Sequence, residues 1–506
     1  MEFLVNALQM KKYDSGTIQQ LGIPALVLME RAALCVTEEM EREGYLEGQV
    51  LVVCGAGNNG GDGFAVARLL VQRSVDVTVV FVGKEEALSE EARIQKKICE
   101  NCGIKISTNL HMREYTTIVD AIFGIGLSRN IEGPYLELIE WINRQSSHVV
   151  AVDIPSGVSA DTGQVLGTAV RADLTVTFAY RKMGQLLYPG ASYCGKIVCR
   201  DIGISAQYFT GEENPSNVFT YTKEDLSDIP KRRPYSNKGS YGKVLLIAGS
   251  KGMSGAACLA ARAAYRTGCG LVRVFTPESN RQVIQTYLPE AIVTVWEGDS
   301  FPEQELMAAL AWSDVAGIGP GVGTGEIQRE ILTHVLTQYD KPLVIDADGL
   351  NLLAKETEIL KKVRSPVILT PHVGEMERLI GMNKEEFLKD IVNTVCEFAK
   401  EYKVICALKD ARTVVSDGAS IYVNTSGNSG MATGGSGDVL TGIVLGLLSQ
   451  GMSPFEAASV GVYLHGLAGD EARRKSSAYG MLAGDIAEEV GVVLKAADVT
   501  AEKAEL

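Results

Sequence analysis

The fold of this chain is most constrained by the stretch QVLVVCGAGNNGGDGFAVARLLVQR, residues 49–73. It begins with apolar residues, continues through a glycine-rich turn and ends in a segment whose apolar residues have helical spacing. This order predicts a buried strand over 49–54 and a helix over 63–73. An apolar strand that leads into a helix starts a crossover between parallel strands, so the pattern predicts an α/β fold.

The same alternation continues along the chain and is interrupted once. In the first half it predicts further strands near 76–82, 117–121, 148–153, 173–179 and 196–200, and helices near 26–43, 86–102 and 135–145. In the second half it predicts strands near 243–249, 271–275, 314–318, 342–346, 366–370 and 403–408, and helices near 254–268 and 436–450. Strands separated by such helices predict two doubly wound, three-layer α/β domains.

A polar segment with three prolines separates the two series. It shows no sustained periodicity, which is typical of a linker. We therefore expect an N-terminal domain over 1–210, a linker over 211–240 and a C-terminal domain over 241–500. In the N-terminal domain the ligand is expected at the carboxyl ends of the parallel strands.

Charge and hydropathy argue against two classes of partner. The net charge is −14 and no Lys- or Arg-rich block is present, so the chain is expected to repel nucleic acid and anionic membranes. No run of about 18 uncharged apolar residues occurs, and the first residues lack the pattern of a secretion signal. We therefore expect a cytoplasmic protein without nucleic-acid or membrane partners. A homo-oligomer is also expected, although the sequence does not give its size.

The glycine-rich turn departs from an ordinary dinucleotide-binding turn. It contains G-x-G-x-x-G, but the acid that should hold the ribose about 20 residues later is missing, because Val80, Phe81 and Val82 lie there. The turn also carries polar side chains that a pyrophosphate does not require, at Asn58, Asn59 and Asp62. A plain NAD dehydrogenase is therefore disfavoured.

Polar residues follow two further strands, at the edge where the ligand is expected. Asp120 and Asp153 end their strands, and Ser156 follows Asp153 in the segment VDIPSGV. Together with Asn59, the oxygens of Asp120 and Ser156 suit a hard cation. The loop at 124–129 supplies glycine amides and an arginine for a phosphate. Asp153, beside that site, is a candidate for acid/base chemistry.

The segments VVCGAGNNGGDGFAVARLL, VDAIFGIGL, VDIPSGV and LGIPALVLMERAA resemble the NAD(P)H-hydrate epimerase domain over about residues 5–205. The resemblance implies a Rossmann-like fold, hydrated NADH or NADPH as substrate, K+ at Asn59, Asp120 and Ser156, and Asp153 as the acid/base. The substrate-binding residues that it implies are Asn58, Asn59, Gly60, Gly61, Asp62, Gly124, Ile125, Gly126, Leu127, Ser128, Arg129, Asn130 and Asp153. The hydrate carries a hydroxyl on ring C6, next to N1, and a proton-assisted step can invert that centre.

The segment NTSGNSGMATGGSGDVLTGI, residues 424–443, is the sharpest signal in the second half. Gly434, Gly435 and Gly437 permit close approach of the backbone, and a helix is expected directly afterwards. Free amides at a helix N-terminus bind phosphate oxygens. Asp438 lies in the first turn, where a phosphate would repel it unless it acts on the ligand. Asp438 fits the role of a general base that takes the proton of a hydroxyl attacking phosphorus. The alternative is that Asp438 only stabilises the start of the helix through its negative charge.

This segment resembles the ADP-dependent NAD(P)H-hydrate dehydratase of the ribokinase-like superfamily. YSNKGSYGKVLLIAGSKGMSGAACLAARAAYRTGCGLV, GIGPGVGT, VIDADGLNLL and LTPHVGEMERL extend the resemblance over about residues 225–495. It implies Mg2+ and ADP as a co-substrate. It places the hydrate near Ala256, Gly323, His372 and Asp438. It places ADP on Lys409, Asp410, Ala411, Arg412, Thr413, Asn428, Gly434, Gly435, Ser436 and Gly437. Two positions depart from the family pattern: Val373 replaces a proline and Asp410 replaces a glycine.

The resemblances predict a bifunctional enzyme that epimerises the R and S hydrates and dehydrates the S form at the expense of ADP. GGSGD also fits a ribokinase-like small-molecule kinase with a nucleotide-binding N-terminal domain, which would accumulate a phosphorylated product. A third reading is a scaffold whose N-terminal domain only binds nucleotide or RNA-processing partners.

Overall fold

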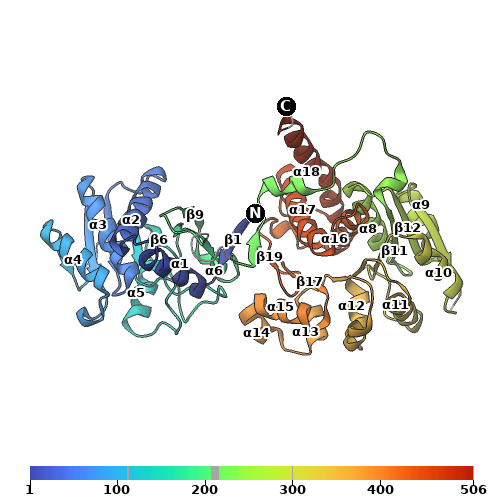
Figure 1. The fold of residues 1–506 in the computed structure, drawn as a ribbon, viewed down its shortest axis with the longest axis horizontal. Helices are drawn as coiled ribbons and strands as arrows, with labels where there is room; N and C mark the ends of the chain where they lie inside the picture. The colour runs from blue at the N-terminus through green and yellow to red at the C-terminus, as the bar shows by residue number, and fades with distance from the viewer. Residues whose placement is uncertain (111–112, 207–215, 299, 505–506) are drawn as a thin grey trace. The chain divides into compact units, whose positions relative to one another are not determined.

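The computed structural model describes residues 1–110, 113–206, 216–298 and 300–504, with side chains up to residue 495 (Figure 1). The chain forms two compact units, one of Phe3–Asn217 and one of Met1–Glu2 with Val218–Leu506. The expected boundary at 210–211 falls in residues 207–215, outside the described part of the chain. No helix among the described residues has the length and hydropathy needed to cross a bilayer.

The N-terminal unit is built on a parallel sheet in the order β4-β3-β2-β5-β6-β7-β9. Its strands are β2 (Gln49–Cys54), β3 (Asp76–Phe81), β4 (Ile106–Ser107), β5 (Thr117–Ala121), β6 (His148–Val152), β7 (Leu174–Phe178) and β9 (Lys196–Arg200). Its helices are α1 (Ala7–Gln19), α2 (Ala25–Arg42), α3 (Asn58–Gln72), α4 (Glu90–Asn101), α5 (Pro134–Asn143) and α6 (Met183–Leu186). A short parallel pair, β1 (Glu2–Val5) with β8 (Arg181–Lys182), lies outside this sheet.

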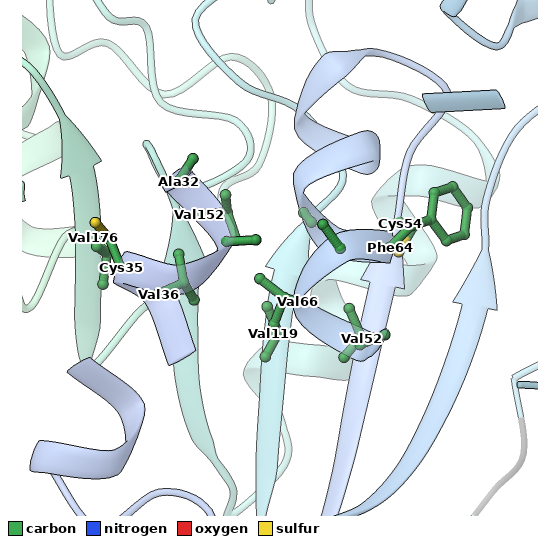
Figure 2. Close-up of a cluster of buried hydrophobic side chains, with 14 of the residues drawn as sticks. Ala32, Cys35, Val36, Val52, Cys54, Phe64, Val66, Val119, Val152 and Val176 are labelled. Atoms are coloured by element: carbon green, nitrogen blue, oxygen red, sulfur yellow. The ribbon is translucent and has the colours of Figure 1, made fainter. Parts of the chain in front are cut away.

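Both faces of this sheet are covered, which accounts for its continuous apolar strands. Along β2, Val52 and Cys54 lie beside Phe64 and Val66 of α3, whereas α2 packs near Val152 and Val176 of the neighbouring strands (Figure 2). The alternate β2 residues Leu51 and Val53 pack with Ile139 of α5 in a second cluster. The structure thus confirms a three-layer, doubly wound α/β fold here.

Helix α3 differs from its predicted extent. The sequence predicts a loop up to residue 62 and a helix from 63, whereas α3 begins at Asn58 with Gly57 as its N-cap. The glycines after Asn59 are poor helix formers, but they are the residues that allow this helix to pack closely on the chain before it. The polar residues of the turn therefore stand in the first two turns of a helix.

The C-terminal unit has a longer sheet, in the order β13-β12-β11-β14-β15-β16-β17-β18-β19-β10. All pairs in it are parallel except β17–β18 and β18–β19. Its strands are β10 (Val218–Thr220), β11 (Lys243–Ile247), β12 (Leu271–Pro277), β13 (Ile292–Trp296), β14 (Val315–Ile318), β15 (Leu343–Ile345), β16 (Val367–Leu369), β17 (Ile405–Leu408), β18 (Val414–Ser416) and β19 (Ile421–Val423).

Helices cover both faces of this second sheet as well (Figure 1). On one side α8, α16, α17 and α18 pack together. The helices are α8 (Ser254–Thr267), α9 (Arg281–Tyr287), α10 (Glu303–Trp312), α11 (Glu326–Gln338), α12 (Ala347–Leu353), α13 (Val373–Ile380), α14 (Lys384–Phe387), α15 (Ile391–Tyr402), α16 (Ser436–Ser449), α17 (Pro454–Lys475) and α18 (Ala483–Ala504).

Part of the segment expected as a linker is ordered within the C-terminal unit. Strand β10 pairs with β19 through Val218 and Phe219, and a 3-10 helix follows at Lys223–Asp228. Phe219 packs against the rings of Tyr422 and Phe455. A strand of three residues is too short to show a periodic apolar pattern. The sequence therefore could not predict β10, which is surrounded by a polar segment with several prolines.

Helices α8 and α16 approach closely because small residues face each other. A Cβ on Gly442 would lie 2.1 Å from the Ala260 carbonyl oxygen and 2.8 Å from Ala263 Cβ. Gly442→Ala is therefore expected to destabilise the unit by about 1–3 kcal/mol, through overpacking. A lower thermal midpoint would show this. Gly255→Ala, on α8 where a Cβ meets nothing within 4 Å, is the control and should not lower the midpoint; an unchanged midpoint for Gly442→Ala contradicts the packing argument.

Candidate functional site

A cavity of about 570 Å³ opens at the carboxyl ends of β2, β5 and β6 in the N-terminal unit. Most residues that the sequence assigned to the hydrate line it: Asn58, Asn59, Asp62, Gly124, Ile125, Gly126, Leu127, Ser128, Arg129 and Asp153. Gly60, Gly61 and Asn130 are not among the lining residues. The cavity is large enough for a nucleotide-sized ligand.

The glycines of the turn allow the backbone and neighbouring side chains to pack closely. A Cβ on Gly60 would lie 1.8 Å from the Gly55 carbonyl oxygen, and one on Gly55 would lie 2.0 Å from the Ile122 carbonyl oxygen. A Cβ on Gly61 would meet the Met29 side chain at 2.6 Å. These glycines let α3 start close to the strand ends, which brings Asn58, Asn59 and Asp62 to the cavity.

Asp120 and Ser156 form a buried polar pair beneath the cavity. Both are fully buried, and Ser156 Oγ donates to Asp120 Oδ1 at 2.6 Å while its backbone N–H donates to Oδ2 at 2.8 Å. Asn59 is 9% exposed, and its Nδ2 has no hydrogen-bond partner in the described structure. Gly124 packs against Asn59, with the site of its missing Cβ 3.4 Å from Asn59 Cγ.

Asp153 directly follows β6 and has a left-handed backbone conformation with φ 66°, which Asp tolerates better than most residues. Its carboxylate accepts from Lys182 Nζ and from Thr177 Oγ1. Lys182 is only 1% exposed and donates further to Thr177 Oγ1 at 2.8 Å and to the Phe178 carbonyl oxygen at 3.2 Å. Gln185 Nε2 donates to the Asp153 carbonyl oxygen at 2.7 Å. Asp153 is thus fixed at the cavity wall by a buried ammonium.

The sequence did not point to Lys182. It lies 29 residues beyond Asp153, in the two-residue strand β8, and nothing in FAYRKMGQ distinguishes it from the surface lysine that this residue type usually is. Only the fold brings it under the cavity.

In the C-terminal unit, GGSGD leads into α16 as expected. Gly435 is the N-cap residue with φ 90°, and Asp438 is the third residue of the helix. The site of a Cβ on Gly437 lies 3.2 Å from Lys409 Nζ. The free amides of the first turn, an ammonium and a carboxylate therefore meet at one place.

Asp346 links the residues of this site through three hydrogen bonds. It is 1% exposed and accepts from Lys409 Nζ at 2.7 Å, from Thr370 Oγ1 at 2.8 Å and from Thr441 Oγ1 at 2.9 Å. Thr441 lies on α16, one turn after Asp438. Asp346 lies in the segment VIDADGLNLL, and the sequence alone assigned it no role. The available signal was an acid directly after a strand, the position that Asp153 also occupies.

The electrostatics favour a proton acceptor at Asp438. Burial, reinforced by the negative charge of Asp346, raises the pKa of Asp438 to about 7, and Lys409 opposes the rise. A carboxylate with a pKa near the working pH is well matched to general base chemistry.

The other residues predicted to meet the hydrate are Ala256, Gly323 and His372, and each has a defined neighbour in the C-terminal unit. The Gly323 N–H donates to Asp348 Oδ2 at 2.9 Å, and Ala256 faces Gly321 on the adjoining loop. His372 caps α13 and pairs through its backbone with Lys409. Burial and the nearby Lys409 lower the pKa of His372.

The residues predicted to hold ADP fall into three segments. Lys409, Asp410, Ala411, Arg412 and Thr413 occupy the end of β17 and the connection to β18, and Asp410 is exposed. Asn428 is tied to α17, because its Nδ2 donates to the Gly469 carbonyl oxygen and to Asp470 Oδ1. Gly434, Gly435, Ser436 and Gly437 form the third segment. His465, which the sequence did not indicate, lies 3.3 Å from Ser436 Oγ through Nε2, and burial lowers its pKa to about 4.

Comparisons with known proteins agree with this division. Residues 25–184 match the family model described as YjeF-related protein N-terminus, and residues 244–491 match the model described as NAD(P)H-hydrate dehydratase. A ribokinase-like superfamily protein from Enterococcus faecalis has a similar structure, with a TM-score of 0.50 and 30% identity, over 56% of this chain and 96% of that one. The C-terminal unit therefore has the expected ribokinase-like fold.

Full-length relatives carry both parts. The chain is 36% identical to the bifunctional NAD(P)H-hydrate repair enzyme of Escherichia coli, over 92% of this chain and 89% of the relative. It is 38% identical to that of Moorella thermoacetica, over 97% of both chains. With this identity over nearly its whole length, the protein belongs to the family of bifunctional NAD(P)H-hydrate repair enzymes.

Proposed function

We propose that this chain repairs hydrated NAD(P)H in two steps. The N-terminal unit interconverts the R and S hydrates, and the C-terminal unit returns the S hydrate to NAD(P)H while ADP is split to AMP and phosphate. The observation that carries this proposal is the meeting of Asp438, Lys409 and the first amides of α16 at one place. It combines a base, a cation and a phosphate-binding helix start, which phosphoryl transfer requires.

The residues of the N-terminal unit fit a bound K+. Asp120 and Ser156 present buried oxygens, and the amide of Asn59 has an unpartnered buried atom beside them. A half-turn of that amide exchanges Nδ2 for Oδ1, which a cation would take as a ligand. Asn59, Asp120 and Ser156 would then hold the ion, whose charge compensates Asp120 and stabilises the start of α3 and the loop at Gly124.

The C-terminal unit fits Mg2+ bound together with a nucleotide. No group of three His, Cys, Asp or Glu side chains suited to a metal occurs among the described residues. Mg2+ in nucleotide sites commonly takes one or two carboxylates and completes its shell with phosphates and water. Asp348 and the buried Glu375 are the carboxylates beside Asp438 and Lys409 that would supply those ligands. The ion would neutralise phosphate charge.

Dehydration then follows from the residues present. Asp438 takes the proton of the C6 hydroxyl, whose oxygen attacks the terminal phosphorus of ADP and releases AMP. The α16 amides and Lys409 stabilise the phosphate charge. The phosphate ester leaves with the C6–O electron pair, and loss of a proton from C5 restores the ring double bond. Phosphorylation is needed because hydroxide is a poor leaving group.

The products distinguish this function from that of a small-molecule kinase. With S hydrate, Mg2+ and ADP, the chain should release AMP and free phosphate in proportion to the NAD(P)H that it forms. A phosphorylated product that accumulates without NAD(P)H would instead assign the C-terminal unit to the kinases.

The dehydration rate should depend on pH through Asp438. The ionised form is active and its pKa lies at about 7, so kcat/KM for S hydrate should be level above that pH and should fall about tenfold per pH unit below it. Initial rates of NAD(P)H formation across pH test this. A rate that stays constant well below pH 7 would contradict the assignment of Asp438 as the base.

A further inference from the structure

Asp153 is not the only carboxyl group at the N-terminal cavity. Asp62 of α3 and Asp14 of α1 line the same cavity, together with Lys11, Arg129 and Lys182. Asp62 comes from the first turns of α3, and Asp153 from the end of β6. These two elements border the cavity, so a ligand between them faces one carboxyl group from each. The nine-tenths-buried Asn59 amide, which lacks a partner, lies on the same wall.

The two carboxyl groups have opposite surroundings. Asp153 is paired with the buried ammonium of Lys182. In the described part of the chain, Asp62 forms no such ion pair, although Lys11 and Arg129 line the same cavity. Burial raises the pKa of Asp62 well above its usual range, and the charges of Asp153 and Asp14 raise it further. A carboxyl group with a raised pKa, facing a second carboxyl group that is held by an ammonium, is suited to act as the acid of an acid–base pair.

We propose that Asp62 is a second catalytic residue of the epimerase, which carries the proton that the ring nitrogen of the hydrate takes up, opposite Asp153. This inference rests on the proposed function and adds to it, since a lone carboxylate at Asp153 leaves the nitrogen without a proton donor. Lys182 is a positioning residue, because it donates to the Asp153 carboxylate and fixes that group at the cavity wall.

The step balances with these two groups alone. Asp153 takes the proton of the C6 hydroxyl, and the oxygen forms a carbonyl with C6. The C6–N1 bond breaks, its electron pair goes to N1, and N1 takes the proton of Asp62. Rotation about C5–C6 exposes the other face of the aldehyde. N1 then attacks C6 and returns its proton to Asp62, while the oxygen takes its proton back from Asp153. No oxidant, water or metal-bound group is consumed.

Charged groups from several elements line the cavity around Asp62. Helix α1 contributes Lys11 and Asp14, the loop after β5 contributes Arg129, and β6 and β8 contribute Asp153 and Lys182. Glu91 of α4 acts on Asp14, whose own pKa is raised by burial first and by Glu91 next. The carboxylates thus raise the pKa of Asp62, as its burial does. The start of α3 has the opposite effect, because a helix N-terminus stabilises a negative charge.

The test uses the full chain with mixed R and S hydrate, ADP, Mg2+ and K+. NAD(P)H should form in a fast S phase, which reports dehydration, and in a slower R phase, which reports epimerisation. Asp62→Asn should lower the enzyme-dependent R-phase rate by about 10²–10⁴-fold and leave the S phase unchanged. Asp62→Glu, which keeps an acid, should recover part of that loss, and direct titration of the hydrate in the absence of ADP should show that Asp62→Asn still binds it.

The pH profile separates a catalytic role from a structural one. Because Asp62 must be protonated to donate, the R-phase rate should fall as pH rises through its raised pKa, and Asp14→Asn should move this alkaline limb to lower pH. An R phase that survives in Asp62→Asn, or an alkaline limb that Asp14→Asn leaves in place, would overturn the proposal. A wild-type chain without an R phase above the spontaneous rate would instead overturn the proposed epimerase function itself.

Discussion

The Asp438→Asn protein is expected to bind ADP and to form almost no NAD(P)H from S hydrate. Asparagine keeps the shape of the side chain but cannot take the C6 hydroxyl proton, so the S-phase kcat should fall by about 10²–10⁴-fold. ADP affinity should be kept or increased, because the change removes a negative charge beside the phosphates. Single-turnover NAD(P)H formation and equilibrium ADP titration measure the two effects separately.

The matched control is Asp340→Asn. Asp340 is an exposed acid before β15, at the opposite edge of the same sheet from Asp346. The control should keep wild-type S-phase rates. Wild-type turnover in Asp438→Asn would remove the base from the mechanism, and a parallel loss of ADP binding would assign Asp438 to the nucleotide instead of to the hydroxyl.

The Asp153→Asn protein is expected to lose the R phase and to keep the S phase. Asparagine tolerates the positive φ at this position, so the strand end is preserved, while the proton acceptor is lost. Enzyme-dependent epimerisation should fall by about 10²–10⁴-fold. The size of the S phase then gives the S fraction of the mixture, and the R fraction should be recovered only at the spontaneous rate.

Asp76→Asn provides the comparison for this variant. Asp76 starts β3 at the other edge of the sheet, where its carboxylate accepts from Gln49 Nε2 at an exposed position. This protein should keep both phases. An Asp153→Asn protein with a normal R phase would leave Asp153 as part of the cavity wall without an acid/base role.

The sequence predicted the parts of the fold that depend on long apolar patterns. Strand β2 and helix α8 appear within one residue of their expected ends, because both have continuous apolar faces. Strands β18, β19 and β10 were not predicted, since each has three residues and is held by pairing with a neighbour distant in sequence. Local patterns do not contain such pairings.

The candidate site was predictable where a residue ends a strand or starts a helix. Asp120, Asp153 and Asp438 satisfy that rule, and the structure places each at a strand end or in the first turn of a helix. Lys182 and His465 do not follow this rule. Each contacts its partner from a segment whose sequence pattern does not mark it as part of a site. Their positions are set by tertiary packing, which decides that one lysine is buried under the cavity and another lies in solvent.

One measurement tests the central claim, that a single chain carries both activities. The wild-type protein is incubated with mixed R and S NADH hydrate, ADP, Mg2+ and K+, and the absorbance of the reduced nicotinamide is followed together with AMP and phosphate. We expect full recovery of both epimers as NADH, with one AMP and one phosphate released for each. Recovery that stops at the S fraction would contradict it, because the chain would then be a dehydratase whose N-terminal unit does not epimerise the substrate.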